Sequence, residues 1–308
     1  MCDHNKNFPK ITLITPSFNQ GEYLEQTILS VLEQDYPNLE YMVIDGGSSD
    51  NSVEIIKKYS DAIDYWVSEA DEGQTHALVK GLARATGEWF NWINSDDLLE
   101  SGALHAIADA SAGVDVVAGN TLNFGFGREK LIKSHNLNAW GLLSRPLGSN
   151  TRWHQPSLWL QTEKIRQAGG LDQSLHYRFD FDLLARYIKA YPKVAYVDRT
   201  LAKFRLHGES KTVNSNKAFR NEAHVVLDKL AAREEFQEWR EELVNLKESY
   251  HWHDYLHASL RVADEGRMGR AARMLKLALK KPSKRFGRKS FTFLFRVLVF
   301  GGPRSKGY

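Results

Sequence analysis

The stretch "KITLITPSFNQGEYLEQTILSVLEQDYPNLEYMVIDGGSSD", residues 10–50, alternates two kinds of apolar pattern. Residues 10–18 and 39–46 are short runs rich in Ile, Val, Thr and aromatic side chains, which are typical of buried strands. Between them, residues 21–34 repeat their apolar side chains at helical spacing. A strand, a helix and a second strand in this order predict two parallel strands joined by a crossover helix.

The same alternation continues as far as residue 120. The expected strands are residues 63–69, 88–94 and 114–120, and the expected helices are residues 49–59, 73–86 and a segment near 101–110. This order predicts an α/β fold with a Rossmann-like, mostly parallel sheet flanked by helices. In such sheets ligands bind beyond the carboxyl ends of the strands, at the point where the strand order reverses.

The second half of the chain is organised differently. Residues 121–210 contain turns, short strand patterns and one clear helix at 180–191, whereas residues 215–280 have a continuous helical pattern. We therefore expect a first domain at 1–212 and a helical C-terminal region at 213–308.

Composition limits the classes of protein that the chain can belong to. A hydrophobic content of 42% and a charged content of 26% are ordinary for a soluble globular protein. Cys2 is the single cysteine, so no disulfide can form within the chain. The sequence begins without the apolar segment of a secretory signal, and no run of 18 apolar residues predicts a spanning helix. A cytoplasmic location is the expectation.

Charge is distributed unevenly along the chain. Residues 261–308 hold 14 Lys and Arg against 2 Asp and Glu, which leaves 27 basic and 36 acidic residues in the rest of the chain. Within this basic tail, the block "FTFLFRVLVF" (291–300) is too short to span a membrane but suits an interface. We expect peripheral contact with an anionic membrane at its inner face. Packing on the body or between copies is the alternative, and no nucleic-acid-binding motif accompanies the charge.

Polar residues follow four of the expected strands, at 15–19, 45–50, 69–74 and 94–97. If the sheet is parallel, these four segments lie along one edge. In the last of them, two carboxylates end the apolar run "GEWFNWINSDD" (87–97), where they face repulsion and a desolvation cost. A metal ion, a helix N-terminus or water must therefore meet them.

Taken together, these segments resemble glycosyltransferase family 2, which has the GT-A fold. The match covers about residues 10–212, and the tail lies outside it. It is carried by "ITPSFNQGEYLEQTILSVLEQDYPNLEYMVIDGGSSDNS", "DEGQTHALVKGLARATGEWFNWINSDD", "WHQPSLW", "GGLDQSLHYRFDFDLLAR" and "FRLHGESKT".

The resemblance implies an inverting, metal-dependent transfer of a sugar from a nucleotide-diphosphate donor to a saccharide or lipid-linked saccharide acceptor, in cell-surface polysaccharide synthesis. Mn²⁺ or Mg²⁺ would neutralise the diphosphate leaving group, and Asp180 would be the general base. The metal ligands would be Asp96 and His207. The implied nucleotide-sugar-binding residues are Thr15, Pro16, Asp45, Asp71, Asn94 and Ser95. The residues assigned to the acceptor or diphosphate side are His154, Gln155, Arg205 and Asp97.

Two residues depart from the family pattern: Asn94 replaces the first Asp of the Asp-x-Asp motif, and Phe179 replaces a Glu before the base. They leave open a catalytically inactive relative that acts as a membrane-bound assembly partner. A sugar-phosphate nucleotidyltransferase is a second alternative, although "TPSFNQGEY" (15–23) lacks the Gly-rich, Arg-containing loop of that class. For Asp96 and Asp97, the alternative role is to cap a helix starting near residue 98.

Overall fold

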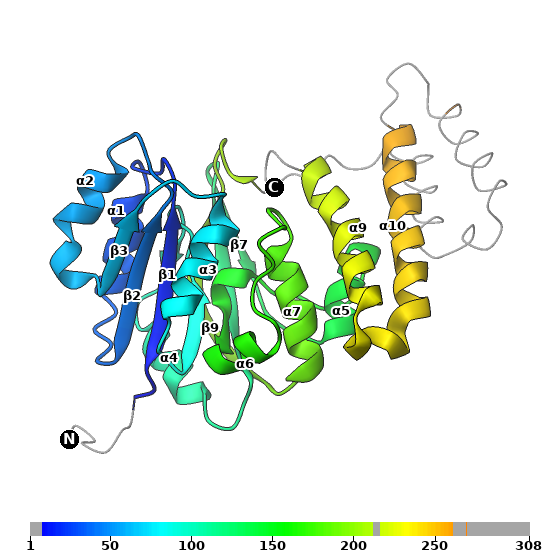
Figure 1. Ribbon diagram of the computed structural model, residues 1–308, viewed down its shortest axis with the longest axis horizontal. Coiled ribbons are helices and arrows are strands. Elements are labelled where there is room, and N and C mark those ends of the chain that lie inside the picture. Colours follow the sequence, from blue (N-terminus) through cyan, green and yellow to red (C-terminus); the bar gives the residue numbers. More distant parts are fainter. Residues whose placement is uncertain (1–7, 212–215, 261–268, 270–308) are drawn as a thin grey trace. The chain divides into compact units, whose positions relative to one another are not determined.

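The computed structural model describes residues 8–211, 216–260 and 269 (Figure 1). The chain divides into two compact units, one of Met1–Arg145 with Ser149–Ala223 and one of Pro146–Gly148 with His224–Tyr308. The strands that the structure describes all belong to the first unit.

The first half of the sheet follows the predicted alternation. Its elements are β1 (Ile11–Ser17), α1 (Leu24–Leu32), β2 (Leu39–Asp45), α2 (Ser52–Lys58), β3 (Tyr65–Ser68), α3 (Gln74–Arg84), β4 (Trp89–Trp92), β5 (Leu98–Leu99) and α4 (Ala103–Ala110). Strands β1 to β4 are all parallel and pair in the order β3-β2-β1-β4. Because β4 joins the far side of β1, the strand order reverses between these two strands. The prediction of an α/β fold with a Rossmann-like sheet is confirmed.

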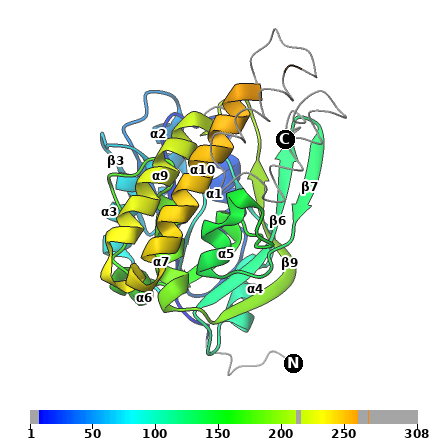
Figure 2. The same ribbon diagram turned by 90° about the vertical axis from the view of Figure 1, so that its right-hand side faces the viewer.

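The second half adds strands in both directions. Its elements are β6 (Val116–Gly125), β7 (Arg128–Ile132), α5 (Ala139–Leu143), β8 (Leu158–Gln161), α6 (Thr162–Gln167), α7 (Phe179–Ala190) and β9 (Val194–Arg205). Strand β8 is antiparallel to both β4 and β6, whereas β6 and β9 are parallel. Figure 2 shows the antiparallel pair β6 and β7, which occupies part of the stretch that sequence patterns left irregular.

Helices cover both faces of the sheet. On one face, apolar side chains of α1, α2 and α4 form a common core with Ile11, Leu13 and Trp89. On the other face α3 packs on β1 and β2, and Gly81 lies against Ile14 so closely that a Cβ atom would have no room. The alternation of side chains along β1 therefore serves two helical layers.

The structure corrects one alternative that the sequence left open. No helix begins near residue 98, because Leu98 and Leu99 form β5 and pair with β9. Helix α4 begins at Ala103, and Gly102, with φ 66°, is its N-cap residue. The proposal that Asp96 and Asp97 cap a helix is wrong.

The described residues 216–260 are mostly helical. Helix α9 (Asn216–Ala232) is followed by a 3₁₀ segment (Glu234–Trp239) and by α10 (Arg240–Leu260). Within the second unit, the apolar side chains of Val226, Leu230 and Leu243 are fully buried. The basic tail falls outside the described residues, and none of the described helices is long and apolar enough to span a membrane.

Candidate active site

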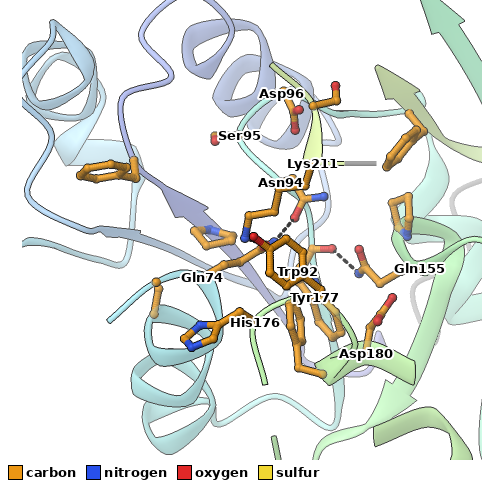
Figure 3. Close-up of a pocket in the computed structure, with 18 of the residues that line it drawn as sticks. Gln74, Trp92, Asn94, Ser95, Asp96, Gln155, His176, Tyr177, Asp180 and Lys211 are labelled. Carbon is orange, nitrogen blue, oxygen red and sulfur yellow. Dashed lines mark hydrogen bonds between the residues drawn. The ribbon is translucent and has the colours of Figure 1, made fainter. Parts of the chain in front are cut away.

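A cavity of about 630 Å³ opens at the carboxyl ends of the parallel strands, and all the residues that line it belong to the first unit. The polar segments that follow β1 to β4 each contribute to its wall, so the structure brings together the four strand ends. Loops from the second half of the unit supply the opposite wall (Figure 3). The sequence-predicted residues that line it are Pro16, Asp71, Asn94, Ser95, Asp96, His154, Gln155, Asp180 and His207.

Thr15 and Asp45 lie behind this wall. Thr15 is fully buried and its hydroxyl is 2.9 Å from the Tyr41 hydroxyl. The buried Asp45 carboxylate accepts hydrogen bonds from the Ser48 backbone N–H at 2.9 Å and from the Ser68 hydroxyl at 2.7 Å. Asp45 therefore shapes the loop after β2, and its side chain is not among those lining the cavity.

The β1 and β2 end of the cavity has both apolar and acidic groups. Phe18 is 59% exposed, which leaves its ring available for stacking. Asp71 accepts a hydrogen bond from the Gly73 backbone N–H at 2.7 Å. A Cβ atom on Gly46 would stand 3.1 Å from the Asp71 carboxylate, so glycine keeps this acidic group open to the cavity.

Asn94 stands in a chain of hydrogen bonds at the cavity, and Figure 3 shows the bond between Gln74 and Asn94. The Lys211 ammonium donates to Gln74 at 3.1 Å, and the Gln74 amide donates to Asn94 Oδ1 at 2.6 Å. The Asn94 amide nitrogen in turn donates to Asp97 Oδ2 at 3.0 Å. An aspartate at position 94 cannot make this last donation, because an ionised carboxylate only accepts. This bond gives a physical reason for the departure at position 94.

Asp97 is fully buried and points away from the cavity. Burial and the neighbouring Asp96 raise the pKa of Asp97 well above its usual range. The backbone N–H of Arg205, at 2.8 Å, and the Asn94 amide act in the opposite direction by stabilising the ionised form. Asp97 thus anchors the start of the 94–97 turn to the end of β9.

The variant Asn94→Asp is expected to lower the free energy of unfolding by about 3 kcal/mol at neutral pH, because it sets a second carboxylate against buried Asp97. Both carboxyls would have folded-state pKa values above their unfolded values. The penalty should therefore grow as the pH rises above about 4 and shrink below it. Urea unfolding across this pH range measures it, with the exposed Asn51→Asp as control. An equal loss at pH 4 and pH 7 would show that carboxylate repulsion is not the cause.

Asp96 and His207 form a polar pair at the cavity whose donor atoms suit a cation. His207 Nε2 lies 2.9 Å from Asp96 Oδ2, and the Tyr23 ring packs on His207 at 4.7 Å between centroids. Arg205 is placed behind the pair, where its Nε donates to the Asp96 backbone carbonyl at 2.8 Å. No cluster of three His, Cys, Asp or Glu ligands occurs in the described part of the chain. Two donors fit a cation whose remaining ligands are phosphate oxygens and water.

Asp180 lies across the cavity, in the first turn of α7. Burial raises its pKa, and the charges of Arg178 and Arg145 oppose that shift. Its neighbour Phe179 is buried against Trp92, with 5.9 Å between ring centroids. Position 179 is therefore part of the apolar packing in the cavity wall, which accounts for the second departure.

Asp182 has a different role from Asp180. It forms a 2.6 Å ion pair with Arg186, and both side chains are only 2% exposed. Arg186 also donates to the backbone carbonyl of Gly170 at 2.7 Å. The pair fixes α7 to the turn after α6, as expected for a structural carboxylate.

The segment 153–159 is divided between cavity and core. Gln155 donates to the Trp92 carbonyl at 2.8 Å, and His154 packs edge-on against Phe204 at 5.0 Å. Burial lowers the pKa of His154 to about 4, so the ring is neutral at pH 7. Trp153 lines the cavity, whereas Trp159 is fully buried in the core.

Sequence patterns did not indicate several further groups at the site. Lys211 lines the cavity and has a pKa lowered by burial. Glu222, on α9, accepts hydrogen bonds from three consecutive backbone N–H groups, those of His176, Tyr177 and Arg178, at 2.7 to 2.9 Å. It therefore fixes the loop that leads into the first turn of α7. No local sequence pattern around Glu222 indicates this role.

A comparison with protein-family models finds a family whose model matches about half of the chain. The family model described as Glycosyl transferase family 2 matches residues 12–168. An uncharacterized glycosyltransferase of Rickettsia typhi is 27% identical over 68% of this chain and 68% of its own length. The Campylobacter jejuni GalNAc(5)-diNAcBac-PP-undecaprenol beta-1,3-glucosyltransferase is 36% identical over the aligned region. That region spans 37% of this chain and 38% of that enzyme.

Solved structures resemble the whole fold at low sequence identity. S. aureus TarS 1–349 in complex with UDP-GlcNAc has a TM-score of 0.62 and 13% identity, covering 94% of this chain and 87% of that one. The mannosyltransferase PcManGT from Pyrobaculum calidifontis, in complex with GDP-Man and Mn²⁺, has a TM-score of 0.57 and 18% identity, covering 95% and 86%. At these identities the likeness concerns the fold.

Proposed function

This chain belongs to glycosyl transferase family 2, and we propose that it is an inverting, metal-dependent enzyme that moves a sugar from a nucleotide-diphosphate donor to a hydroxyl acceptor. One observation carries the proposal: Asp96, after β4, and Asp180, on α7, line the same cavity. That arrangement supports a leaving group held at one end and a general base at the other.

We assign the nucleotide to the end of the cavity near β1 and β2. Pro16 and the exposed ring of Phe18 provide apolar surface for a base, while Asp71 offers a carboxylate to ribose or base N–H and O–H donors. Thr15 and Asp45 act from behind by holding the β1 and β2 ends in place. Structures of the fold in complex with UDP-GlcNAc and with GDP-Man support this class of donor.

Asp96 and His207 would hold a divalent cation, Mn²⁺ or Mg²⁺. When bound, such a cation neutralises the charge that develops on the diphosphate as the glycosidic bond breaks. The chain's own contribution is to keep both donor atoms facing one another, with Ser95 and Asn94 beside them. The Mn²⁺ complex of PcManGT supports the use of a divalent metal.

Asp180 would accept the proton of the acceptor hydroxyl as that oxygen attacks the anomeric carbon from the side opposite the diphosphate. Its raised pKa makes it a stronger base than an exposed aspartate. His154 and Gln155 lie on this side of the cavity and would contact the acceptor. Because one base acts opposite the leaving group, the transfer inverts the anomeric configuration.

We propose a saccharide or lipid-linked saccharide as acceptor, in the synthesis of a cell-surface polysaccharide. The name of the Campylobacter jejuni relative, which includes undecaprenol, supports a lipid-linked acceptor. A domain at 1–212, a helical region at 213–308 and a basic tail would suit an enzyme in the cytoplasm that contacts the inner face of the membrane peripherally. No nucleic acid is proposed as a partner.

A thermal-shift panel of UDP, GDP, dTDP and their sugars, with and without Mn²⁺, tests the proposal. One nucleotide should raise the melting temperature by about 5 °C at saturation, and Mn²⁺ should increase that shift. Mn²⁺ alone should have little effect, because the described part of the chain places only two donor side chains together, those of Asp96 and His207. If no nucleotide stabilises the protein, donor binding is excluded; if one binds without transfer or donor hydrolysis, the alternative of an inactive assembly partner is favoured.

A further inference from the structure

The acceptor end of the cavity carries two guanidinium groups near the Asp180 carboxyl. Arg145 and Arg178 both line the cavity together with Asp180. Within the described residues, neither arginine forms an ion pair. Arg178 donates through Nε to the Phe219 carbonyl at 3.0 Å, and Arg145 donates to the Trp153 carbonyl at 3.4 Å. Each therefore keeps guanidinium N–H groups with no partner in the described part of the chain.

Of the two guanidinium groups, Arg145 is the one whose burial costs more free energy. Burial lowers its pKa first, and the charges of Arg152 and Arg178 lower it further, with only the charge of Asp180 acting against them. A cation withdrawn from water costs free energy unless it is paired and hydrogen-bonded. Within the described residues, Arg145 makes one long hydrogen bond and lies 5.6 Å from the centre of the Trp153 ring. The fold alone does not compensate it.

Two neighbouring polar atoms lack partners as well. Trp153 Nε1 and His154 Nδ1 are buried and have no hydrogen-bond partner among the described residues. An indole N–H and a guanidinium can only donate, so the groups around Arg145 are short of acceptors. Oxygen atoms that carry negative charge would satisfy them best.

We propose that this end of the cavity binds an oxyanion, a carboxylate or a phosphate, with Arg145 as its main ligand and Arg178 as its second. The planar fork of a guanidinium matches two oxygens of either group. Taking the oxyanion as part of the acceptor rests on the proposed function, and it makes the acceptor an anionic saccharide or a phosphate-linked one. The acceptor hydroxyl then reaches Asp180, while Arg145 and Arg178 bind the negative charge of the acceptor.

Probe binding tests the site directly. With the donor end filled by UDP and Mn²⁺, glucuronic acid, glucose 1-phosphate and glucose are titrated by saturation-transfer NMR. At least one anion should bind about tenfold more tightly than glucose, as expected for charge-assisted hydrogen bonds. Arg145→Gln should abolish this preference. Arg128→Gln is the matched control and should keep it, because Arg128 is exposed on β7 and is not among the charges that act on Arg145.

The two anions separate the possible sources of the charge. Preference for glucuronic acid indicates a uronic acid in the acceptor, and preference for glucose 1-phosphate indicates a phosphate-linked carrier. If Arg145→Gln does not fold, Arg145→Lys keeps the charge but loses the fork and should weaken binding severalfold.

Three results would overturn the proposed site. Glucose could bind as tightly as both anions, neither anion could bind, or the preference for an anion could survive in Arg145→Gln. If UDP fails to bind but the anion preference depends on Arg145, the site stands and the proposed function fails.

Discussion

Replacing Asp180 by asparagine is expected to reduce sugar transfer by roughly 10²- to 10⁴-fold, the range measured when a positioned general base is lost. The amide cannot accept the acceptor proton, yet it fills the same volume in the first turn of α7. Nucleotide binding should be unchanged, because the proposed donor site lies at the opposite end of the cavity. Steady-state transfer rates and the nucleotide-induced thermal shift, measured on the same preparation, check both parts.

Unlike its activity, the stability of the Asp180→Asn variant should not fall. The folded-state pKa of Asp180 is raised by burial, so its ionised form is disfavoured in the fold, and that cost is present above the unfolded pKa of about 4. Asp180→Asn removes the charge and should leave the protein at least as stable at pH 7. An inactive variant that is also destabilised would mean that activity is lost through misfolding rather than through loss of the base.

Asp182→Asn is the matched comparison on the same helix. It breaks the buried pair with Arg186 and leaves that guanidinium uncompensated, so the free energy of unfolding should fall by about 3 kcal/mol or more. The folded fraction should keep most of its activity. Two aspartates two residues apart would thus separate into a catalytic and a structural carboxylate.

Local sequence patterns were sufficient for the part of the fold that forms the cavity edge. Strands β1 to β4 are short apolar runs separated by amphipathic helices, and that alternation allows few topologies other than a parallel sheet. Once the strands are parallel, Pro16, Asp71 and Asp96 must meet at one edge. Their positions at strand ends followed from local patterns, whereas their roles at the site were implied by the family resemblance.

Other features depend on contacts between distant segments, which a single sequence does not display. In the sequence, Asn94 is only the replacement of a charged residue by a neutral one. In the structure, its amide nitrogen donates a hydrogen bond to Asp97, which also accepts one from the backbone N–H of Arg205. Glu222 belongs to a different helix from the loop that it fixes. Arg145 sits in a stretch without a clear periodic pattern. Their roles come from burial and from partners far along the chain.

Replacing Asp96 by asparagine should lower transfer by about 100-fold or more, the scale found when one group that stabilises developing charge is removed. Asp96 is the carboxylate that faces His207, and the chain offers few other donors there. An amide oxygen is a weaker ligand than a carboxylate for Mn²⁺ or Mg²⁺. The loss should therefore appear mainly in metal dependence, with more Mn²⁺ needed to reach the remaining activity.

The control for this variant is Asp198→Asn. Asp198 is 80% exposed and pairs with Lys133 on the surface, so its loss should change neither activity nor the Mn²⁺ requirement. The thermal shift given by nucleotide with Mn²⁺ should shrink in Asp96→Asn to the value seen with nucleotide alone. An Asp96→Asn protein whose Mn²⁺ response matches that of the wild type would remove Asp96 from the metal site. Positive charge at the diphosphate would then have to come from protein groups, of which Lys211 already lines the cavity.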